Sequence, residues 1–297
     1  MCNINALFSL KENPHKMSFM QSVTSSSFLY NSDGDGIYFN DRNKVFKSKD
    51  KLDLLKYADY FKESDIILSH QRYATHGKTE EYTQPFKTNN FIFLHNGILH
   101  EYTKGEKSDS YNFLINLEEI FIKNLNEMKF REDALILSIK ELLEGKDTGS
   151  YSIIIYDIIN KQTYYFKNSQ TNIHFYKSKN HLYLTTCKNN NKFLNIMGEK
   201  FKEINIKDNK IIKITLSENK INIKSIAKIK QLIIVTPESK YNYEYFKPSM
   251  DYLKDEVESL SYDSPYFANC IYCSTPTYRV DKKLNSYICD MCKWSYK

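Results

Sequence analysis

Short apolar segments rich in β-branched and aromatic residues recur through the first 226 residues, and polar turns separate them. Each segment has the length of one strand and is too short for a buried helix. The clearest examples are residues 3–10, 66–69, 91–95, 151–156 and 210–216. This pattern predicts that β-sheets form most of the core.

Two helices are expected between the two groups of strands. Apolar residues recur at helical spacing from Phe113 to Phe121, and less regularly from Leu135 to Leu143. Strands followed by a helical pair and then by further strands are typical of an α+β layered fold. A doubly wound parallel sheet would instead alternate single strands with single helices.

Composition excludes several classes of protein. Hydrophobic residues make up 41 % of the 297 residues and charged residues 26 %, as in folded globular chains. No apolar run approaches the roughly 18 to 20 residues of a membrane span, and residues 1–5 lack the basic and apolar regions of a secretory signal. We therefore expect a cytoplasmic protein with no membrane partner.

The net charge of +6 does not by itself indicate a nucleic-acid binder. Only four of the 42 basic residues are Arg, and the Lys residues are dispersed among Asp and Glu. Dispersed lysines are typical of a solvated surface, whereas nucleic-acid binders more often cluster Arg and Lys around aromatic residues. Nucleic acid is a possible partner that the composition does not favour.

The chain divides into three parts by composition. Residues 2–228 carry the predicted strands and helices and are long enough for a core of their own. Residues 229–264 are rich in Tyr, Lys, Glu and Ser and include an amphipathic stretch at 250–260, which suggests a linker or docking segment. Residues 265–297 contain most of the cysteines.

Four of the six cysteines form a metal-ligand pattern, C-x2-C followed after fifteen residues by a second C-x2-C. They are Cys270, Cys273, Cys289 and Cys292. Four thiolates in two close pairs can bind Zn2+ tetrahedrally, and this spacing predicts a small zinc ribbon. Such a site has no open coordination position, so its zinc would be structural. Two disulfides are the alternative, which a reducing cytoplasm disfavours.

Cys2 is a candidate nucleophile, because a small residue after Met1 normally permits removal of that methionine. The freed α-amine, with a pKa of about 7.7 to 8.0, could then act as general base for the thiol of the same residue. Many chains begin with Met-Cys by chance. The hypothesis therefore depends on partner residues elsewhere.

Three polar motifs supply such partners. Arg72 follows the strand at 66–69, and its guanidinium could bind an amino-acid carboxylate at two points. Asn96 and Gly97 end another strand and suit an oxyanion hole. Asp109 opens the first helix and could accept from an ammonium group. Taken separately, the three are a surface arginine, an Asn-Gly turn and a helix cap.

Together these residues resemble the glutaminase domain of class II glutamine amidotransferases, which use an N-terminal nucleophile. The matching features are Cys2, R-Y-A-T-H-G at 72–77, H-N-G at 95–97, S-D-S at 108–110 and G-S-Y-S at 149–152. The motif style is closest to that of the glucosamine-6-phosphate synthase branch. The resemblance covers residues 2–226, with Asn3 and Ala6 standing where the family usually has glycines.

The resemblance implies a four-layered αββα fold and hydrolysis of L-glutamine to glutamate and ammonia. In this role Cys2 attacks the side-chain amide, while Asn96 and Gly97 stabilise the oxyanion. The resemblance assigns contacts with glutamine to Arg72, Thr75, His76 and Asp109. Family members that make a product carry a second catalytic domain, and about 70 residues after position 226 are too few for one. We therefore expect the ammonia acceptor on a separate synthase subunit.

Two other functions stay open at this point. The same nucleophile could act on a different amide, although Arg72 and Asp109 together suit both ends of a free amino acid. Alternatively, the chain is a catalytically impaired module whose zinc ribbon binds nucleic acid or protein. Its contact face would then comprise Arg279, Lys282, Lys283, Tyr287, Lys293 and Trp294. Salt-dependent RNA binding by an isolated tail would favour this alternative.

Overall fold

A computed structural model describes residues 2–74, 80–103, 107–146 and 148–230, with four two-residue strands beyond them. The chain separates into two compact units, Met1–Ile233 and Ile234–Lys297. In the second unit β14 pairs with β15, and β16 pairs with β17. These strands are Ala268–Asn269, Pro276–Thr277, Val280–Asp281 and Ser286–Tyr287. The amphipathic stretch at 250–260 lies outside the described residues.

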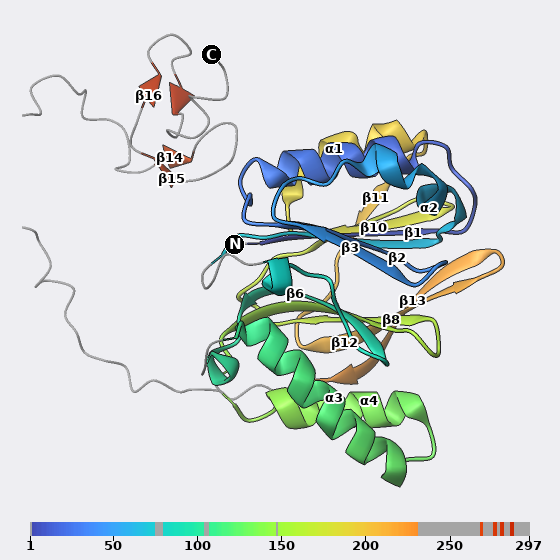
Figure 1. Ribbon diagram of the computed structural model, residues 1–297, viewed down its shortest axis with the longest axis vertical. Helices are drawn as coiled ribbons and strands as arrows, with labels where there is room; N and C mark the ends of the chain where they lie inside the picture. Colours follow the sequence, from blue (N-terminus) through green and yellow to red (C-terminus); the bar gives the residue numbers. More distant parts are fainter. Residues whose placement is uncertain are drawn as a thin grey trace, which may run out of the picture. The chain divides into compact units, whose positions relative to one another are not determined.

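The first unit contains two antiparallel sheets (Figure 1). The first sheet has the order β11-β9-β10-β1-β4-β2-β3. Its strands are β1 (Asn3–Ser9), β2 (Asp35–Phe39), β3 (Lys44–Ser48), β4 (Ile66–Gln71), β9 (His174–Lys177), β10 (His181–Thr185) and β11 (Lys202–Ile204). The second sheet has the order β13-β12-β8-β7-β6-β5. Its strands are β5 (Phe86–Lys87), β6 (Phe91–Ile98), β7 (Ser150–Asp157), β8 (Gln162–Lys167), β12 (Lys210–Ser217) and β13 (Lys220–Lys228).

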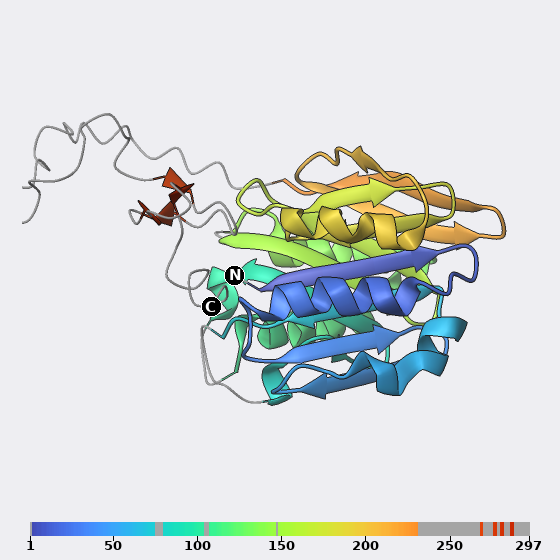
Figure 2. The ribbon, with the colours of Figure 1, turned by 90° about the horizontal axis from the view of Figure 1, so that it is seen from above.

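Helices cover the outer face of each sheet, so the first unit has four layers (Figure 1). The first sheet is covered by α1 (Lys16–Phe28), α2 (Ala58–Glu63) and the 3-10 helices η1 (Leu54–Tyr57) and η4 (Lys188–Met197). Figure 2 shows α1 and η4 side by side over this sheet. The second sheet is covered by α3 (Asp109–Glu127) and α4 (Arg131–Leu143). Two further 3-10 turns are η2 (Glu80–Tyr82) and η3 (His100–Tyr102).

The hydrophobic core comprises three clusters of buried side chains, one between each pair of adjacent layers. Alternate residues of β1 divide between two of them: Ile4 and Phe8 face the second sheet, whereas Leu7 faces α1. All seven residues of β1 are buried, because this strand lies at the centre of its sheet with a layer on either side. A third cluster packs α3 and α4 onto the second sheet.

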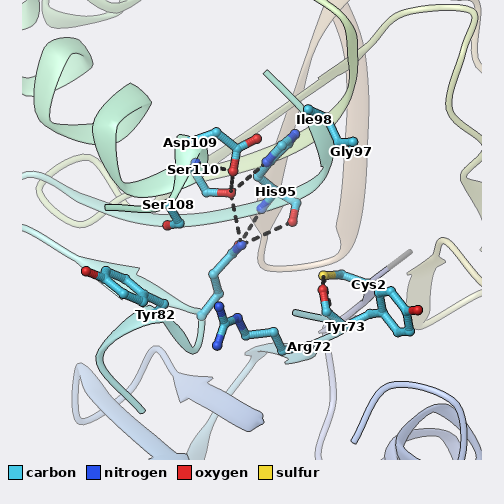
Figure 3. A pocket seen from close by; sticks show the side chains of 11 residues that line it. Cys2, Arg72, Tyr73, Tyr82, His95, Gly97, Ile98, Ser108, Asp109 and Ser110 are labelled. Carbon is cyan, nitrogen blue, oxygen red and sulfur yellow. Dashed lines mark hydrogen bonds between the residues drawn. The ribbon is translucent and has the colours of Figure 1, made fainter. Parts of the chain in front are cut away.

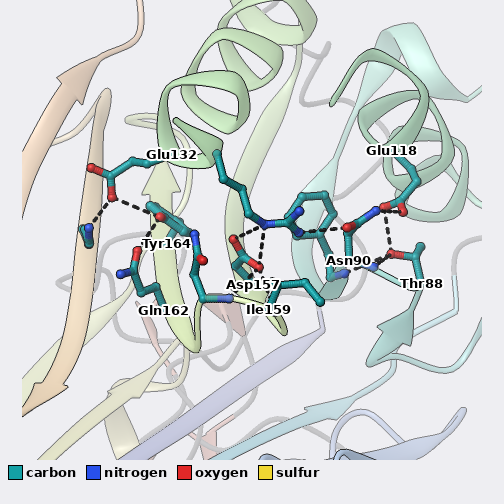
Figure 4. A network of polar contacts seen from close by, with 12 residues as sticks. Thr88, Asn90, Glu118, Glu132, Asp157, Ile159, Gln162 and Tyr164 are labelled. Atoms are coloured by element: carbon teal, nitrogen blue, oxygen red, sulfur yellow. Dashed lines mark hydrogen bonds and ion pairs between the residues drawn. The ribbon is translucent and has the colours of Figure 1, made fainter. Parts of the chain in front are cut away.

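A partly buried polar network anchors α3 and α4 at one end of the second sheet (Figure 4). Arg131, at the start of α4, forms an ion pair with Asp157 at the end of β7, with Nε 2.8 Å from Oδ2. Its Nη2 donates to Oδ1 of Asn90 at 2.8 Å. Asn90 and Thr88 in turn donate to the carboxylate of Glu118 on α3. Removal of Arg131 would leave the buried carboxylate of Asp157 without its ion-pair partner.

The structure confirms the predicted α+β class, and each of the five predicted strands and both predicted helices are present. Two helices, α1 and α2, were not predicted. The sequence of α1 is rich in Ser and Thr, which obscures its apolar periodicity. Within the helix, the hydroxyls of Thr24 and Ser22 donate to the carbonyls of Met20 and Ser18, so these polar residues satisfy their own hydrogen bonds. Among the described residues, no helix is both long and apolar enough to cross a membrane.

Candidate active site

The thiol of Cys2 lies against the backbone of the loop that follows β4. Because β1 pairs with β4 from Asn3 to Gln71, the residue before β1 and the residues after β4 come together. The N–H of Tyr73 donates to Sγ of Cys2 at 3.3 Å, and Sγ lies 3.5 Å from the Tyr73 carbonyl oxygen. The pairing of two central strands therefore fixes the position of the sulfur.

Burial raises the pKa of the Cys2 thiol above its ordinary value. The hydrogen bond from Tyr73 and the positive charge of Arg72 lower the pKa in part. The net direction is upward, so the thiol is mostly protonated at neutral pH. A nucleophile of this kind needs a base to remove its proton.

A cavity of about 220 Å³ lies beside Cys2 (Figure 3). Four of the predicted site residues line it, namely Cys2, Arg72, Gly97 and Asp109. The other lining residues are Tyr73, Tyr82, Gln84, His95, Ile98, Ser108 and Ser110. The walls thus come from the ends of β1, β4 and β6, the start of α3, and the segment between η2 and β5.

Arg72 is 5 % exposed and is held by the segment that precedes β2. Its N–H donates to the carbonyl of Gly34 at 2.8 Å, and its carbonyl accepts from the N–H of Asp33 at 3.0 Å. The carboxylate of Asp33 accepts from the N–H of Ala74 at 2.8 Å. The guanidinium carbon lies 5.9 Å from the centre of the Tyr82 ring. These contacts place a positive charge at one wall of the cavity.

Asp109 places a negative charge at another wall, at the first residue of α3. Ser108 caps this helix, since its hydroxyl accepts from the N–H of Tyr111 at 3.3 Å. The carboxylate of Asp109 accepts from the N–H of Leu99 at 2.8 Å and from the N–H of Ser110 at 2.7 Å. These two backbone donors fix the orientation of the carboxylate at the cavity wall.

Gly97 brings the backbone of β6 to the cavity. Its φ is +138°, and a Cβ atom there would lie 2.0 Å from the carbonyl oxygen of Ser150 on β7. Asn96 is 5 % exposed and does not line the cavity in this structure. It lies on the face of β6 that carries Ile92 and Leu94, which is the face toward the first sheet. Its Oδ1 is buried without a hydrogen-bond partner among the described residues.

Gln84, Tyr82 and His95 are among the lining residues to which sequence reasoning assigned no role. Gln84 precedes Pro85 in a segment without a recognisable motif, and its importance depends on contacts distant in sequence. His95 stood inside the H-N-G run without a role. Its Nδ1 lies 2.8 Å from the hydroxyl of Ser110, and burial lowers its pKa, so the ring is neutral.

Asn3, which stands where the family usually has glycine, does not enter the cavity. It is buried on β1 opposite Gln71, and strand alternation directs its side chain to the face opposite that of Ile4. Thr75 and His76 lie outside the described residues. So do the four predicted zinc ligands, Cys270, Cys273, Cys289 and Cys292.

Comparison with known proteins finds relatives for part of this sequence. The chain is 28 % identical over 149 residues to the glutamine–fructose-6-phosphate aminotransferase of Helicobacter pylori, a match that covers 48 % of the chain and 25 % of the relative. It is 26 % identical over 159 residues to the enzyme of the same name from Bacillus licheniformis, again with 48 % and 25 % covered. The chain thus matches about a quarter of the length of these relatives. No protein-family model matches it.

The chain is similar to solved structures that share little sequence with it. One is glutamine phosphoribosylpyrophosphate amidotransferase from B. subtilis, with a TM-score of 0.52 and 13 % identity over 76 % of this chain and 49 % of that one. Another, described as the allosteric regulatory enzyme of purine biosynthesis, has a TM-score of 0.54 and 15 % identity over 77 % and 50 %. The fold is that of the glutamine amidotransferases.

Proposed function

We propose that this chain hydrolyses the side-chain amide of L-glutamine through a thioester at Cys2. The observation that carries the proposal is the cavity in which the thiol lies together with one buried cation and one carboxylate, Arg72 and Asp109. Opposite charges on two walls suit the carboxylate and ammonium groups of a free α-amino acid. The cavity volume of about 220 Å³ is below the roughly 300 to 1,000 Å³ of sites for drug-sized ligands.

The charges orient the substrate so that its side-chain amide meets the thiol. The guanidinium of Arg72 binds the α-carboxylate at two points, and the carboxylate of Asp109 accepts from the α-ammonium. The thiol is held by Tyr73 on the chain segment that also carries Arg72. The distance between the bound α-carboxylate and the sulfur is therefore set by adjacent residues of one segment.

The reaction then proceeds in two stages. After removal of Met1, the α-amine of Cys2 takes the thiol proton, the sulfur bonds to the amide carbon, and the amine returns the proton to the leaving ammonia. Water next cleaves the thioester and releases glutamate. The N–H of Gly97 donates to the oxyanion of each tetrahedral intermediate. Asn96 lies behind the cavity in this structure, so its side chain must turn toward the oxyanion for Nδ2 to act as the second donor. The positive φ of Gly97 places its peptide at the cavity wall, where no other residue would fit.

We further propose that the ammonia is used by a synthase on a separate polypeptide. The sequence relatives are aminotransferases by name, and a use of the ammonia beyond its release fits that class. Residues 229–264 are the proposed docking segment, and a zinc ribbon at 265–297 is proposed to form the end of that surface.

Substrates with one end blocked test the assignment of the charged walls. We expect ammonia release from L-glutamine but little from N-acetyl-L-glutamine, which lacks the ammonium, or from L-glutamine α-amide, which lacks the carboxylate. Equal rates with all three compounds would show that Arg72 and Asp109 do not select a free amino acid.

A further inference from the structure

The ladder between β5 and β6 is incomplete at the residue that precedes the proposed oxyanion hole. The two strands pair only through Phe86 with Phe93 and Lys87 with Ile92. The residue before Phe86 is a proline, which has no N–H to donate. Continuing the same register would place Gln84 opposite His95, where a strand residue would normally complete the ladder.

The side-chain amide of Gln84 takes the place of this missing strand residue. Its Oε1 accepts from the N–H of His95 at 2.6 Å, and its Nε2 donates to the carbonyl of His95 at 3.3 Å. Paired bonds to the N–H and carbonyl of one residue are what a neighbouring antiparallel strand would supply. The amide therefore holds the β6 backbone directly before Asn96 and Gly97.

The same amide also reaches the start of α3. Its Nε2 donates to the hydroxyl of Ser110 at 3.4 Å. This hydroxyl lies 2.8 Å from Nδ1 of His95 and 3.2 Å from Oδ1 of Asp109 (Figure 3). With Nδ1 of the neutral ring assigned as the donor, the Ser110 hydroxyl is free to donate to Asp109. A continuous chain of hydrogen bonds thus joins the end of β6 to the carboxylate wall.

Gln84 has no donor left for a substrate. Both hydrogens of its Nε2 are used, one by His95 and one by Ser110, and its Oε1 already accepts one bond. The residue is 5 % exposed although it lines the cavity. Its contribution to a reaction is therefore through the groups it holds.

The backbone of Gln84 is located by the segment that also holds Arg72. A Cβ atom on Gly36 would lie 2.0 Å from the carbonyl oxygen of Gln84, so β2 packs directly against it. Two residues earlier, Gly34 accepts from the N–H of Arg72. Gln84 thus contacts the elements that support three walls of the cavity, those formed by Arg72, Asp109 and Gly97.

We propose that Gln84 is a positioning residue that sets the oxyanion donors and Asp109 relative to each other. This inference rests on the proposed glutaminase function. Loss of the amide would release the β6 backbone and the Ser110 hydroxyl together. Both kcat and KM for glutamine would therefore change, whereas a change confined to one wall would alter mainly one of them.

The test is steady-state ammonia release from L-glutamine by the full chain and two variants, at pH values from about 5.5 to 8.5. We expect Gln84→Leu to lower kcat/KM by about 10- to 100-fold, because three buried hydrogen bonds are lost. Gln84→Glu retains an acceptor for the His95 N–H but cannot donate while ionised. Its activity relative to wild type should rise as the pH falls, because the protonated acid regains one donor.

Gln162→Leu is the matched control. Gln162 lies on the second sheet and also accepts a hydrogen bond, from the hydroxyl of Tyr164, but it does not line the cavity. It should retain wild-type kcat and KM. If Gln84→Leu fails to fold, the pH-dependent recovery of Gln84→Glu decides the question. Wild-type activity with unchanged kinetics in both Gln84 variants would overturn this inference alone. Absence of ammonia release from the wild-type chain would overturn the proposed function, and this inference with it.

Discussion

The backbone N–H of Tyr73 lies 3.3 Å from the sulfur of Cys2, across 71 positions of sequence. The thiol is thus bound by the residue that directly follows Arg72 in sequence, and Arg72 lines the same cavity. Nucleophile and proposed carboxylate site therefore both lie at the paired ends of β1 and β4. Separate changes to the two should affect different kinetic constants.

Replacement of Arg72 by lysine should raise KM for glutamine by about 10- to 100-fold, the equivalent of losing a charge-assisted hydrogen bond. Lysine keeps the charge but cannot make a two-point contact with a carboxylate. Steady-state kinetics check this, with Arg42→Lys as control because Arg42 makes a comparable pair with Glu63 on the exposed surface. A wild-type KM in Arg72→Lys would argue against carboxylate binding at this position.

Replacement of Asn96 by alanine should lower kcat by about 10²- to 10³-fold, the usual cost of one oxyanion donor. KM should change little, because the donor acts mainly on the transition state. Asn116→Ala on the exposed side of α3 is the control, since its amide donates only to the helix carbonyl of Asn112. An unchanged kcat in Asn96→Ala would show that the oxyanion is stabilised by the Gly97 N–H without Asn96.

Much of this fold follows from patterns within short windows of sequence, and the remainder depends on contacts between distant windows. The helix α3 shows its apolar residues at regular spacing, and β6 shows a continuous apolar run that ends in Asn-Gly. By contrast, α1 hides its buried Thr24 among polar neighbours. Gln84 shows no local signal at all, because its role arises only where residues 84, 95 and 110 meet.

The site residues divide in the same way. Arg72, Gly97 and Asp109 lie in recognisable runs, and the structure brings all three to one cavity with Cys2. The position of Asn96 behind that cavity depends on which face of β6 it occupies, and the run of letters H-N-G does not show this.

Gly97→Ala should abolish ammonia release and destabilise the fold. The added Cβ would meet the Ser150 carbonyl at 2.0 Å, and the φ of +138° is unfavourable for alanine. Gly145→Ala is a matched control, because Gly145 also has a positive φ of +71° but no atom within 4 Å of the added Cβ. It should cost only about 1 kcal/mol in unfolding free energy. Equal unfolding costs in urea would show that the β7 contact does not restrict Gly97.

The free energy of unfolding should fall as the pH decreases below neutrality. Burial lowers the pKa of His70 to about 3 in the folded chain, against about 6.5 when unfolded. The unfolded state therefore binds more protons between these values, and stabilisation present above pH 6.5 is lost progressively as the pH falls toward 3. Urea titrations should show a steeper slope for wild type than for His70→Gln, by at most about 1.4 kcal/mol per pH unit. The exposed His15→Gln serves as control, and identical slopes in the His70 variant would contradict this assignment.

The C-terminal cysteines should bind one zinc per chain. Cys289→Ser removes one thiolate from a proposed four-cysteine site, so its metal content should fall after dialysis against a chelator. The glutaminase activity of residues 2–228 should persist without the segment. Undiminished zinc in the variant would remove the ribbon from the account.

The most direct test of the central claim is ammonia release from L-glutamine by wild type, Cys2→Ala and Cys187→Ala, each with its N-terminus defined by intact mass. Both cysteines are half-buried and free, so each variant controls for the other. The account predicts a wild-type chain that begins at Cys2, no activity in Cys2→Ala, and near-normal activity in Cys187→Ala. Ammonia release that survives in Cys2→Ala would contradict it.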